Sequence, residues 1–299
     1  MSDATEIIGP FSCWHISQRL RLHYVDWGNG EAAPVILVHG GRDHARSWDW
    51  VARHLRSRFH VVAPDLRGHG DSAWAIGSNY PIYEFVYDLA QLVDVVAPDG
   101  PVVLIGHSFG GVISTQYAAV FPDRVKALVN IEGFGPPPEL VSLWRDTPMP
   151  DQMARWVVQM RRLASRSPRH YPTLDEAAER MQQENPSLSE ERARHLTIHG
   201  AARNEDGTYS WKFDNYFRSM PPREWKSDGL LENFQRIPCP TLLVRGADSW
   251  AEDLEADGRA KALAQGRTVE IPGAGHFVQH DQFDALMEAV DGFLDDVVA

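Results

Sequence analysis

The chain has 299 residues, of which 43% are hydrophobic and 23% charged, and its formal net charge is −12. This length and composition allow a single large domain, or one domain with an insertion, to bury a substantial core, and they exclude disorder for the bulk of the chain. The acidic balance argues against nucleic acid or an anionic membrane as a partner and, more weakly, against a highly anionic substrate.

Signals for targeting and for disulfide formation are absent from the sequence pattern. The first residues show no basic segment followed by an apolar run, and no stretch approaches the roughly 18 apolar residues of a membrane span. We therefore expect a cytoplasmic protein that does not enter a membrane. The two cysteines, Cys13 and Cys239, belong to no cluster, so we expect reduced thiols. No metal-ligand motif is apparent, and we expect neither a metal nor a cofactor.

Short apolar runs alternate with helical patterns in the first half of the chain. An antiparallel pair of strands is expected around residues 14–27, before a glycine-rich turn. Unbroken apolar runs, typical of strands buried on both faces, follow at residues 34–38, 59–63, 102–105 and 127–131. Helical patterns follow three of them, around residues 48–55, 83–96 and 112–120. This order predicts an α/β fold with a mostly parallel, doubly wound sheet.

The alternation stops at a segment rich in glycine and proline that begins at Gly133. From residue 136 to residue 228 the chain is polar and helix-like, without an apolar strand. Strand patterns return at 240–244 and 268–271, ahead of a final helix at about 282–298. We therefore predict a core formed by residues 1–135 and 229–299, with a helical cap inserted over 136–228.

Residues 106–110 read Gly-His-Ser-Phe-Gly and lie between a predicted strand and a predicted helix. A sharp turn at this place lifts the Oγ of Ser108 above the carboxyl edge of the sheet, and the glycines allow the backbone to bend. The start of the helix supplies free N–H groups that favour a developing oxyanion. A structural turn whose serine caps the helix is the alternative, but the flanking strand and helix favour a nucleophile.

A serine hydroxyl becomes a nucleophile only when a base removes its proton. His276 follows the last predicted strand and precedes the final helix, which is where such a base is expected. His107 precedes Ser108 directly, so its side chain points the other way. We interpret His107 as a packing residue and keep it as a candidate for substrate contact.

An acid is needed to orient the histidine and to stabilise its charged form. Glu132 follows the predicted strand 127–131, and Asp248 follows the strand that starts at residue 240. Both strands end at the same edge of the sheet, so the residues alone leave both carboxylates open.

The core resembles the α/β-hydrolase superfamily over residues 15–135 and 236–298. The resemblance rests on four motifs, which are His39-Gly40, Asp-Leu-Arg-Gly-His-Gly-Asp-Ser at 65–72, Gly-His-Ser-Phe-Gly-Gly at 106–111 and Gly-Ala-Gly-His at 273–276. It implies the α/β-hydrolase fold, and it gives the segment 65–72, with Asp65, His69 and Asp71, a structural rather than a catalytic role.

The resemblance also bears on the acid. Most members carry an aspartate three residues beyond a glycine after the later strand, and that register, counted from Gly246, falls on Ser249, one residue past Asp248. A subset that includes many haloalkane dehalogenases keeps the acid before the cap, and Glu132, 24 residues after Ser108, matches that place. We therefore favour Glu132. Dehalogenases and epoxide hydrolases of this fold use an aspartate nucleophile, so the serine disfavours their chemistry.

The resemblance assigns the oxyanion hole to the backbone N–H groups of Phe109 and Gly41, with Arg42 as the alternative to Gly41, and such donors contribute about 3 kcal/mol each. The loop residues Arg42, Asp43 and His44 are candidates for substrate contact. Apolar cap residues either line an acyl pocket or form the core of the cap: Trp144, Met149, Met153, Trp156, Met160, Trp211 and Trp225.

Together these features predict a serine hydrolase that works through an acyl-enzyme on a small or medium apolar ester, thioester or lactone. Its partner is then a small apolar acyl substrate, and the protein is expected to be a monomer or a homodimer. A carbon–carbon bond hydrolase, an amidase or a cofactor-free haloperoxidase of the same fold is an alternative. A ligand receptor that kept the fold and lost turnover is another.

Overall fold

The computed structural model describes residues 9–136, 142–143, 146–219, 232–251 and 258–298. An eight-stranded sheet runs through the molecule in the order β1-β2-β4-β3-β5-β6-β9-β10. The β1–β2 and β2–β4 pairs are antiparallel and the remaining pairs are parallel, which confirms the predicted sheet. The strands are β1 (Phe11–Ser17), β2 (Leu20–Asp26), β3 (Pro34–Val38), β4 (His60–Pro64), β5 (Val102–His107), β6 (Val125–Ile131), β9 (Thr241–Gly246) and β10 (Gly266–Ile271).

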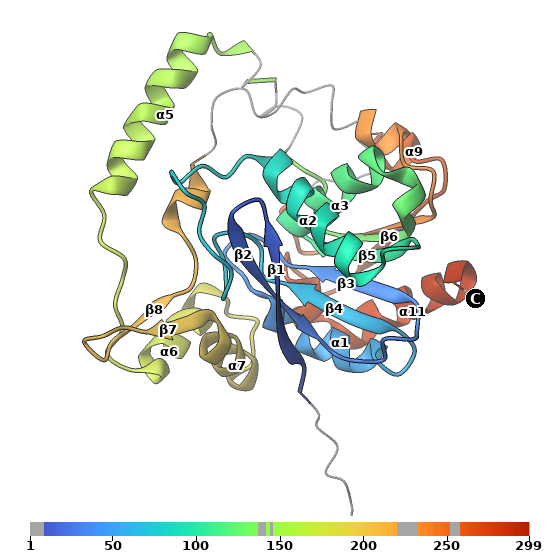
Figure 1. Cartoon of the computed structure of the whole chain (residues 1–299), viewed down its shortest axis with the longest axis horizontal. Helices are drawn as coiled ribbons and strands as arrows, with labels where there is room; N and C mark the ends of the chain where they lie inside the picture. The colour runs from blue at the N-terminus through green and yellow to red at the C-terminus, as the bar shows by residue number, and fades with distance from the viewer. Residues whose placement is uncertain (1–8, 137–141, 144–145, 220–231, 252–257, 299) are drawn as a thin grey trace, which may run out of the picture.

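Helices cover both faces of this sheet (Figure 1). One face packs against α2 (Ile82–Val96) and α3 (Phe109–Val120), and the other packs against α1 (Asp49–Leu55) and α11 (Phe283–Val298). Short helical segments complete the core: η1 (Ala45–Trp48), η2 (Pro122–Arg124), α9 (Arg259–Ala262) and α10 (Val278–Asp281). Helices on both faces of a largely parallel sheet give the α/β-hydrolase architecture expected from the sequence.

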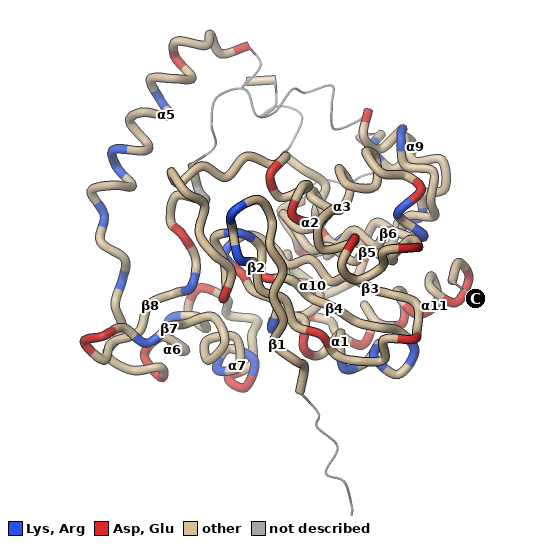
Figure 2. The backbone as a smooth tube through the Cα atoms, viewed as in Figure 1, with Lys and Arg blue, Asp and Glu red and all other residues tan. Residues whose placement is uncertain are grey.

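A second group of elements lies between β6 and β9 in the chain and forms one side of the molecule, opposite the C-terminus (Figure 1). It contains α5 (Met149–Ala164), α6 (Leu174–Glu184), α7 (Glu190–Gly200), β7 (Ala201–Arg203), β8 (Tyr209–Trp211) and η3 (Asn215–Arg218). The antiparallel β7–β8 pair corrects the expectation of a purely helical segment. Within α5 Leu163 is the buried residue, and the helix carries several arginines although the chain is acidic overall (Figure 2).

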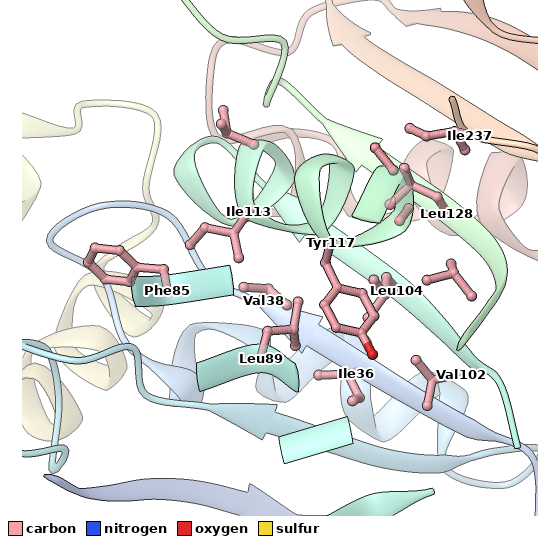
Figure 3. Packing of buried hydrophobic residues seen from close by; sticks show 14 of the residues in the cluster. Ile36, Val38, Phe85, Leu89, Val102, Leu104, Ile113, Tyr117, Leu128 and Ile237 are labelled. Carbon is pink, nitrogen blue, oxygen red and sulfur yellow. The ribbon is translucent and has the colours of Figure 1, made fainter. Parts of the chain in front are cut away.

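Side chains of the central strands alternate between two buried layers. On β3, Ile36 and Val38 face α2 and α3, whereas Val35 and Leu37 face α1 and α11. Figure 3 shows the first layer, in which Ile36 and Val38 lie near Leu89 of α2 and Tyr117 of α3. Because both faces are covered, the strands read as unbroken apolar runs in the sequence.

Polar contacts join α7 to the core. The His195 Nε2 lies 3.1 Å from the Oδ2 of Asp49, whose carboxylate also pairs with Arg46 at 2.6 Å. The His44 Nε2 lies 2.9 Å from the carbonyl oxygen of Leu196, and Arg192 donates a hydrogen bond to the carbonyl oxygen of His280. These contacts hold α7 against α1, α10 and the segment that leads into η1. No helix in the described part of the chain combines the length and apolar character that crossing a bilayer requires.

Candidate active site

Ser108 lies in a tight turn between β5 and α3, with φ 51° and ψ −118°. An L-residue rarely adopts a positive φ, and such strained positions concentrate at functional sites. The Ser108 N–H donates to the carbonyl oxygen of Ile131 at 2.8 Å, which ties the turn to the end of the neighbouring strand β6. A Cβ atom on Gly110 would collide with the carbonyl oxygen of Val38, so the helix can begin this close to β3 only with glycine there.

The side chains of Ser108, His276 and Glu132 form a continuous hydrogen-bonded series. The Oγ of Ser108 lies 2.9 Å from the Nε2 of His276, and the Nδ1 of the same ring lies 3.1 Å from the Oε2 of Glu132. His276 lies in the loop after β10, and Glu132 directly follows β6. Three segments far apart in the chain therefore meet at the carboxyl edge of the sheet, in the arrangement that nucleophile, base and acid require.

The carboxylate of Glu132 is fully buried and receives two further hydrogen bonds. The Gly246 N–H donates to Oε1 at 2.8 Å, and the Ser249 hydroxyl donates to Oε2 at 2.5 Å. Donors on both oxygens stabilise a buried negative charge and fix its direction. Asp248, the alternative acid, is exposed, and its contact with the histidine loop is a backbone one, from its N–H to the Ala274 carbonyl oxygen at 2.9 Å. The structure thus brings Glu132, and not Asp248, to His276.

His107 lies beneath the histidine loop and is almost fully buried. Its Nε2 is 2.8 Å from the carbonyl oxygen of His276, so this nitrogen carries a proton and donates it. Burial, and next the charge of His276, lower the pKa of His107 well below its usual value, which keeps the ring neutral. The ring also borders the cavity at Ser108. Its geometry fits the packing interpretation, with the substrate contact left as a prediction.

Two backbone N–H groups are free at the site. The Phe109 N–H is at the start of α3 and the Gly41 N–H is in the loop after β3, and neither has a hydrogen-bond partner among the described residues. A Cβ atom at residue 41 would lie 2.7 Å from the ring of Phe217, so this loop approaches the aromatic wall closely because it has glycine there. Gly41 and Phe109 both line the cavity that contains Ser108.

A cavity of about 510 Å³ opens at Ser108. Its walls are largely aromatic, and the side chains that form them include Tyr80, Phe109, Phe217, Trp250 and Phe277. A second cavity of about 840 Å³, between the core and the cap, shares Gly41, Arg42 and Phe277 with the first. Asp43, His44 and Trp211 line this larger cavity. Of the other apolar candidates, Met149, Met153, Trp156 and Met160 of α5 line neither cavity. Trp144 and Trp225 lie outside the described residues.

The segment 65–72 lines no part of the cavity at Ser108, although Gly70 and Asp71 border the larger cavity. The buried carboxylate of Asp65 accepts hydrogen bonds from the Ala45 N–H at 2.7 Å and the Asp71 N–H at 2.9 Å, and the Nδ1 of His23 lies 2.7 Å from it. Burial alone would raise the pKa of Asp65, but the contact with His23 and the charges around it bring this pKa below its ordinary value. The carboxylate thereby ties η1 to the loop after β4, which fits the structural role given to this segment.

The fold also gathers titratable groups that no sequence motif indicated. Within the described residues, Asp49, His195 and His199 bring one ligand atom each within 4.8 Å of one another, and so do His23, Asp65 and Asp71. Each group joins two residues of one segment, His195 with His199 or Asp65 with Asp71, to a third residue from a distant segment, so spacing in the sequence could not reveal the complete group. Arg46 occupies the first group through its ion pair with Asp49. None of these side chains lines the cavity at Ser108.

The chain is similar in sequence and in structure to known hydrolases. The chain is 30% identical over 271 residues to Esterase Rv0045c of Mycobacterium tuberculosis, covering 90% of this chain and 85% of that one. A solved structure of that esterase has a TM-score of 0.76, at 26% identity, with 96% and 92% of the two chains covered. The chain is also 29% identical over 290 residues to the 2-hydroxy-6-oxo-2,4-heptadienoate hydrolase of Pseudomonas putida, covering 91% of each.

A shorter segment matches Lipase LipV of Mycobacterium tuberculosis, with 43% identity over 111 residues, which is 37% of this chain and 41% of the lipase. The model of the Alpha/beta hydrolase family matches residues 35–289, a range that contains Ser108, Glu132 and His276. The match spans both halves of the core and the segment inserted between them. The chain therefore belongs to the Alpha/beta hydrolase family.

Proposed function

We propose that the protein is a serine hydrolase that cleaves a small or medium ester, thioester or lactone through an acyl-enzyme on Ser108. The observation that carries this proposal is the series of hydrogen bonds from the Ser108 Oγ through His276 to a buried Glu132. Relatives named esterase and lipase support an ester as the bond that is cleaved.

In the first step, the Nε2 of His276 accepts the proton of the Ser108 hydroxyl while the Oγ forms a bond to the substrate carbonyl carbon. The carbonyl oxygen becomes an oxyanion and accepts hydrogen bonds from the N–H groups of Gly41 and Phe109. The buried carboxylate of Glu132 stabilises the imidazolium that has formed. His276 then gives its proton to the leaving group as the bond to that group breaks.

In the second step, a water molecule attacks the acyl-enzyme. His276 accepts a proton from the water while the water oxygen forms a bond to the carbonyl carbon, and it returns that proton to the Ser108 Oγ as the acyl bond breaks. The products are the carboxylic acid and the regenerated serine. The aromatic walls of the 510 Å³ cavity favour an apolar acyl chain.

A carbon–carbon bond hydrolase is the second candidate, and its support is the relative named 2-hydroxy-6-oxo-2,4-heptadienoate hydrolase. That compound and 4-nitrophenyl esters of different chain lengths, offered to the same preparation, separate the two candidates. Turnover of the dienoate at a kcat/KM well above that of every ester would favour the second.

A fluorophosphonate probe tests the enzyme proposal itself. We expect covalent labelling of the wild-type protein, located at Ser108 by peptide mass spectrometry, and no labelling of Ser108→Ala. A protein that is neither labelled nor active on any ester would instead be a ligand receptor of this fold.

A further inference from the structure

We propose that Arg42 binds a carboxylate of the substrate, so that the preferred substrates are esters of acids that carry a second, free carboxylate. This inference rests on the proposed hydrolase function and names its substrate class. Arg42 directly follows Gly41 and borders two cavities, the one at Ser108 and the larger one under the cap. A group held by Arg42 therefore lies beside the proposed oxyanion hole, at the junction of the two spaces.

Arg42 provides the permanent charge at the cavity around Ser108. Among the described residues that line this cavity the others are glycines, serines, apolar side chains and the two histidines His107 and His276, and no carboxylate is present. A single cation among aromatic walls favours a ligand that is apolar along most of its length and carries one negative charge.

No acidic side chain of the larger cavity pairs with Arg42 within the described residues, and each of them has another partner there. Asp71 pairs with Lys212 at 2.7 Å, and Asp214 accepts a hydrogen bond from the Tyr80 hydroxyl at 2.6 Å. Asp43 accepts a hydrogen bond from the His44 N–H at 2.9 Å. The fourth, Glu184, pairs with Arg180 of its own helix at 2.5 Å. Arg42 itself is exposed and forms no hydrogen bond or ion pair with a described residue.

Arg42 has a positive φ, as do two proposed catalytic residues. Six non-glycine residues have a positive φ in the described chain, and three of these, Arg42 at 65°, Ser108 at 51° and Glu132 at 57°, belong to this site. Glycine or asparagine adopts this conformation at lower cost than arginine. Backbone strain of this kind concentrates at functional sites, which agrees with a role for the loop at residue 42.

A monocarboxylate fits this arrangement better than a more highly charged group. A guanidinium binds a carboxylate through two parallel hydrogen bonds, and one carboxylate neutralises one arginine. A phosphate dianion would bring a second charge into a protein whose net charge is −12. The acidic surface thus remains an argument against highly anionic substrates, while the charge of Arg42 selects a single carboxylate.

The test compares two esters of equal acyl length, 4-nitrophenyl hydrogen adipate, which has a free carboxylate, and 4-nitrophenyl hexanoate, which has none. The readout is the ratio of their kcat/KM values, corrected for spontaneous hydrolysis. We expect this ratio to fall about 10- to 100-fold in Arg42→Gln, because a charge-assisted hydrogen bond is lost. Arg42→Lys keeps the charge without the two parallel bonds and should give an intermediate ratio. The matched control Arg162→Gln removes an exposed arginine of α5 that lines neither cavity, and it should leave the ratio unchanged.

A ratio that is the same in the wild type and Arg42→Gln would overturn the inference while leaving the hydrolase function standing. Failure of the proposed function looks different, because both esters would then remain uncleaved and Ser108 unlabelled. Binding tests the inference without turnover. Monomethyl adipate should bind to Ser108→Ala at least 10-fold more tightly than dimethyl adipate in calorimetry, and this preference should disappear in Ser108→Ala/Arg42→Gln. Equal binding of the two compounds would also overturn it.

Discussion

The hydroxyl of Ser249 donates a hydrogen bond to the Oε2 of Glu132 at 2.5 Å. Ser249 occupies the position, three residues beyond Gly246, where most members of the superfamily are expected to carry the acid. In this chain the side chain at that position supports an acid that comes from the end of β6. The backbone N–H of Gly246, at the end of β9, is a second donor to this carboxylate. The end of β9 and the loop after it therefore orient the carboxylate of Glu132, which itself comes from the end of β6.

Replacing each candidate acid by its amide shows which of the two supports His276. Glu132→Gln keeps the shape of the side chain and removes its charge, so the imidazolium of His276 loses its stabilising partner. We expect kcat for a 4-nitrophenyl ester to fall about 10³- to 10⁴-fold. Asp248→Asn is the matched control, and it should retain activity within about twofold because its side chain is exposed. Loss of activity in Asp248→Asn with full activity in Glu132→Gln would assign the acid to the loop after β9.

The position of Ser249 allows the acid to be moved. In the double variant Glu132→Gln/Ser249→Asp, the new carboxylate replaces a hydroxyl that already contacts the Oε2 of Glu132. We expect kcat of the double variant to exceed that of Glu132→Gln about tenfold or more, since a negative charge near His276 is restored. Esterase assays of the two single variants and the double variant measure this. Equal activity of Glu132→Gln with and without Ser249→Asp would show that the position cannot serve His276.

Buried neutral histidines make stability depend on pH. The Nε2 of His39 accepts a hydrogen bond from the Leu66 N–H at 3.0 Å, so the ring must be neutral in the folded protein. Burial, and next the charge of His69, lower the pKa of His39 to about 3. Between pH 6.5 and about pH 3, His39 is protonated in the unfolded chain but neutral in the folded protein. The free energy of unfolding therefore decreases as the pH falls through this range. Each such histidine contributes a slope of up to about 1.4 kcal/mol per pH unit.

Urea unfolding between pH 7.5 and pH 4.5 measures this slope. The free energy of unfolding of His39→Gln should depend less steeply on pH than that of the wild type, by about 1 kcal/mol per pH unit. His170 has a half-exposed side chain, and His170→Gln should leave the slope unchanged. A slope that His39→Gln does not alter would show that the pKa of His39 is the same in the folded and the unfolded protein.

The contact between α7 and the core depends on Asp49, whose side chain is fully buried. Asp49→Asn removes the charge that faces Arg46 and His195, and it leaves Arg46 without its ion-pair partner. We expect the free energy of unfolding to fall by about 2–4 kcal/mol. Asp175→Asn removes one exposed partner of an ion pair with Arg194 and should change it by less than about 1 kcal/mol. Equal effects of the two substitutions, measured by urea unfolding, would contradict the importance of the buried pair.

Local patterns in the sequence predict the core and the three central site residues, because each residue follows a strand with a strong apolar signal. Ser108 follows β5, Glu132 follows β6 and His276 follows β10. In a parallel sheet these strand ends share one edge, so order along the chain translates into proximity. The same reasoning left Glu132 and Asp248 open, since direction of a side chain in a loop depends on turns that hydrophobic patterns do not encode.

Features of the cap were harder to predict because its elements are short and half exposed. Strands β7 and β8 have three residues each, which is too short for an alternating pattern to be recognised. The turn at Asp206-Gly207 between them, where Gly207 has φ 89°, is the remaining signal in the sequence. The role of Ser249 and the gathering of Asp49, His195 and His199 arise from contacts between distant segments. Contacts of this kind cannot be predicted from the spacing of residues along the chain.

The position of Glu132 before the cap has a consequence for how the site is divided along the chain. The nucleophile, the acid and both proposed oxyanion donors all precede α5, whereas His276 follows β9. A polypeptide cut between the cap and β9 would therefore have its general base on a separate fragment. The two fragments would rejoin through the parallel pairing of β6 with β9, in which Ile131 lies opposite Val244. Esterase activity recovered on mixing would then report the formation of that one strand pair, which makes this hydrolase a candidate for complementation assays.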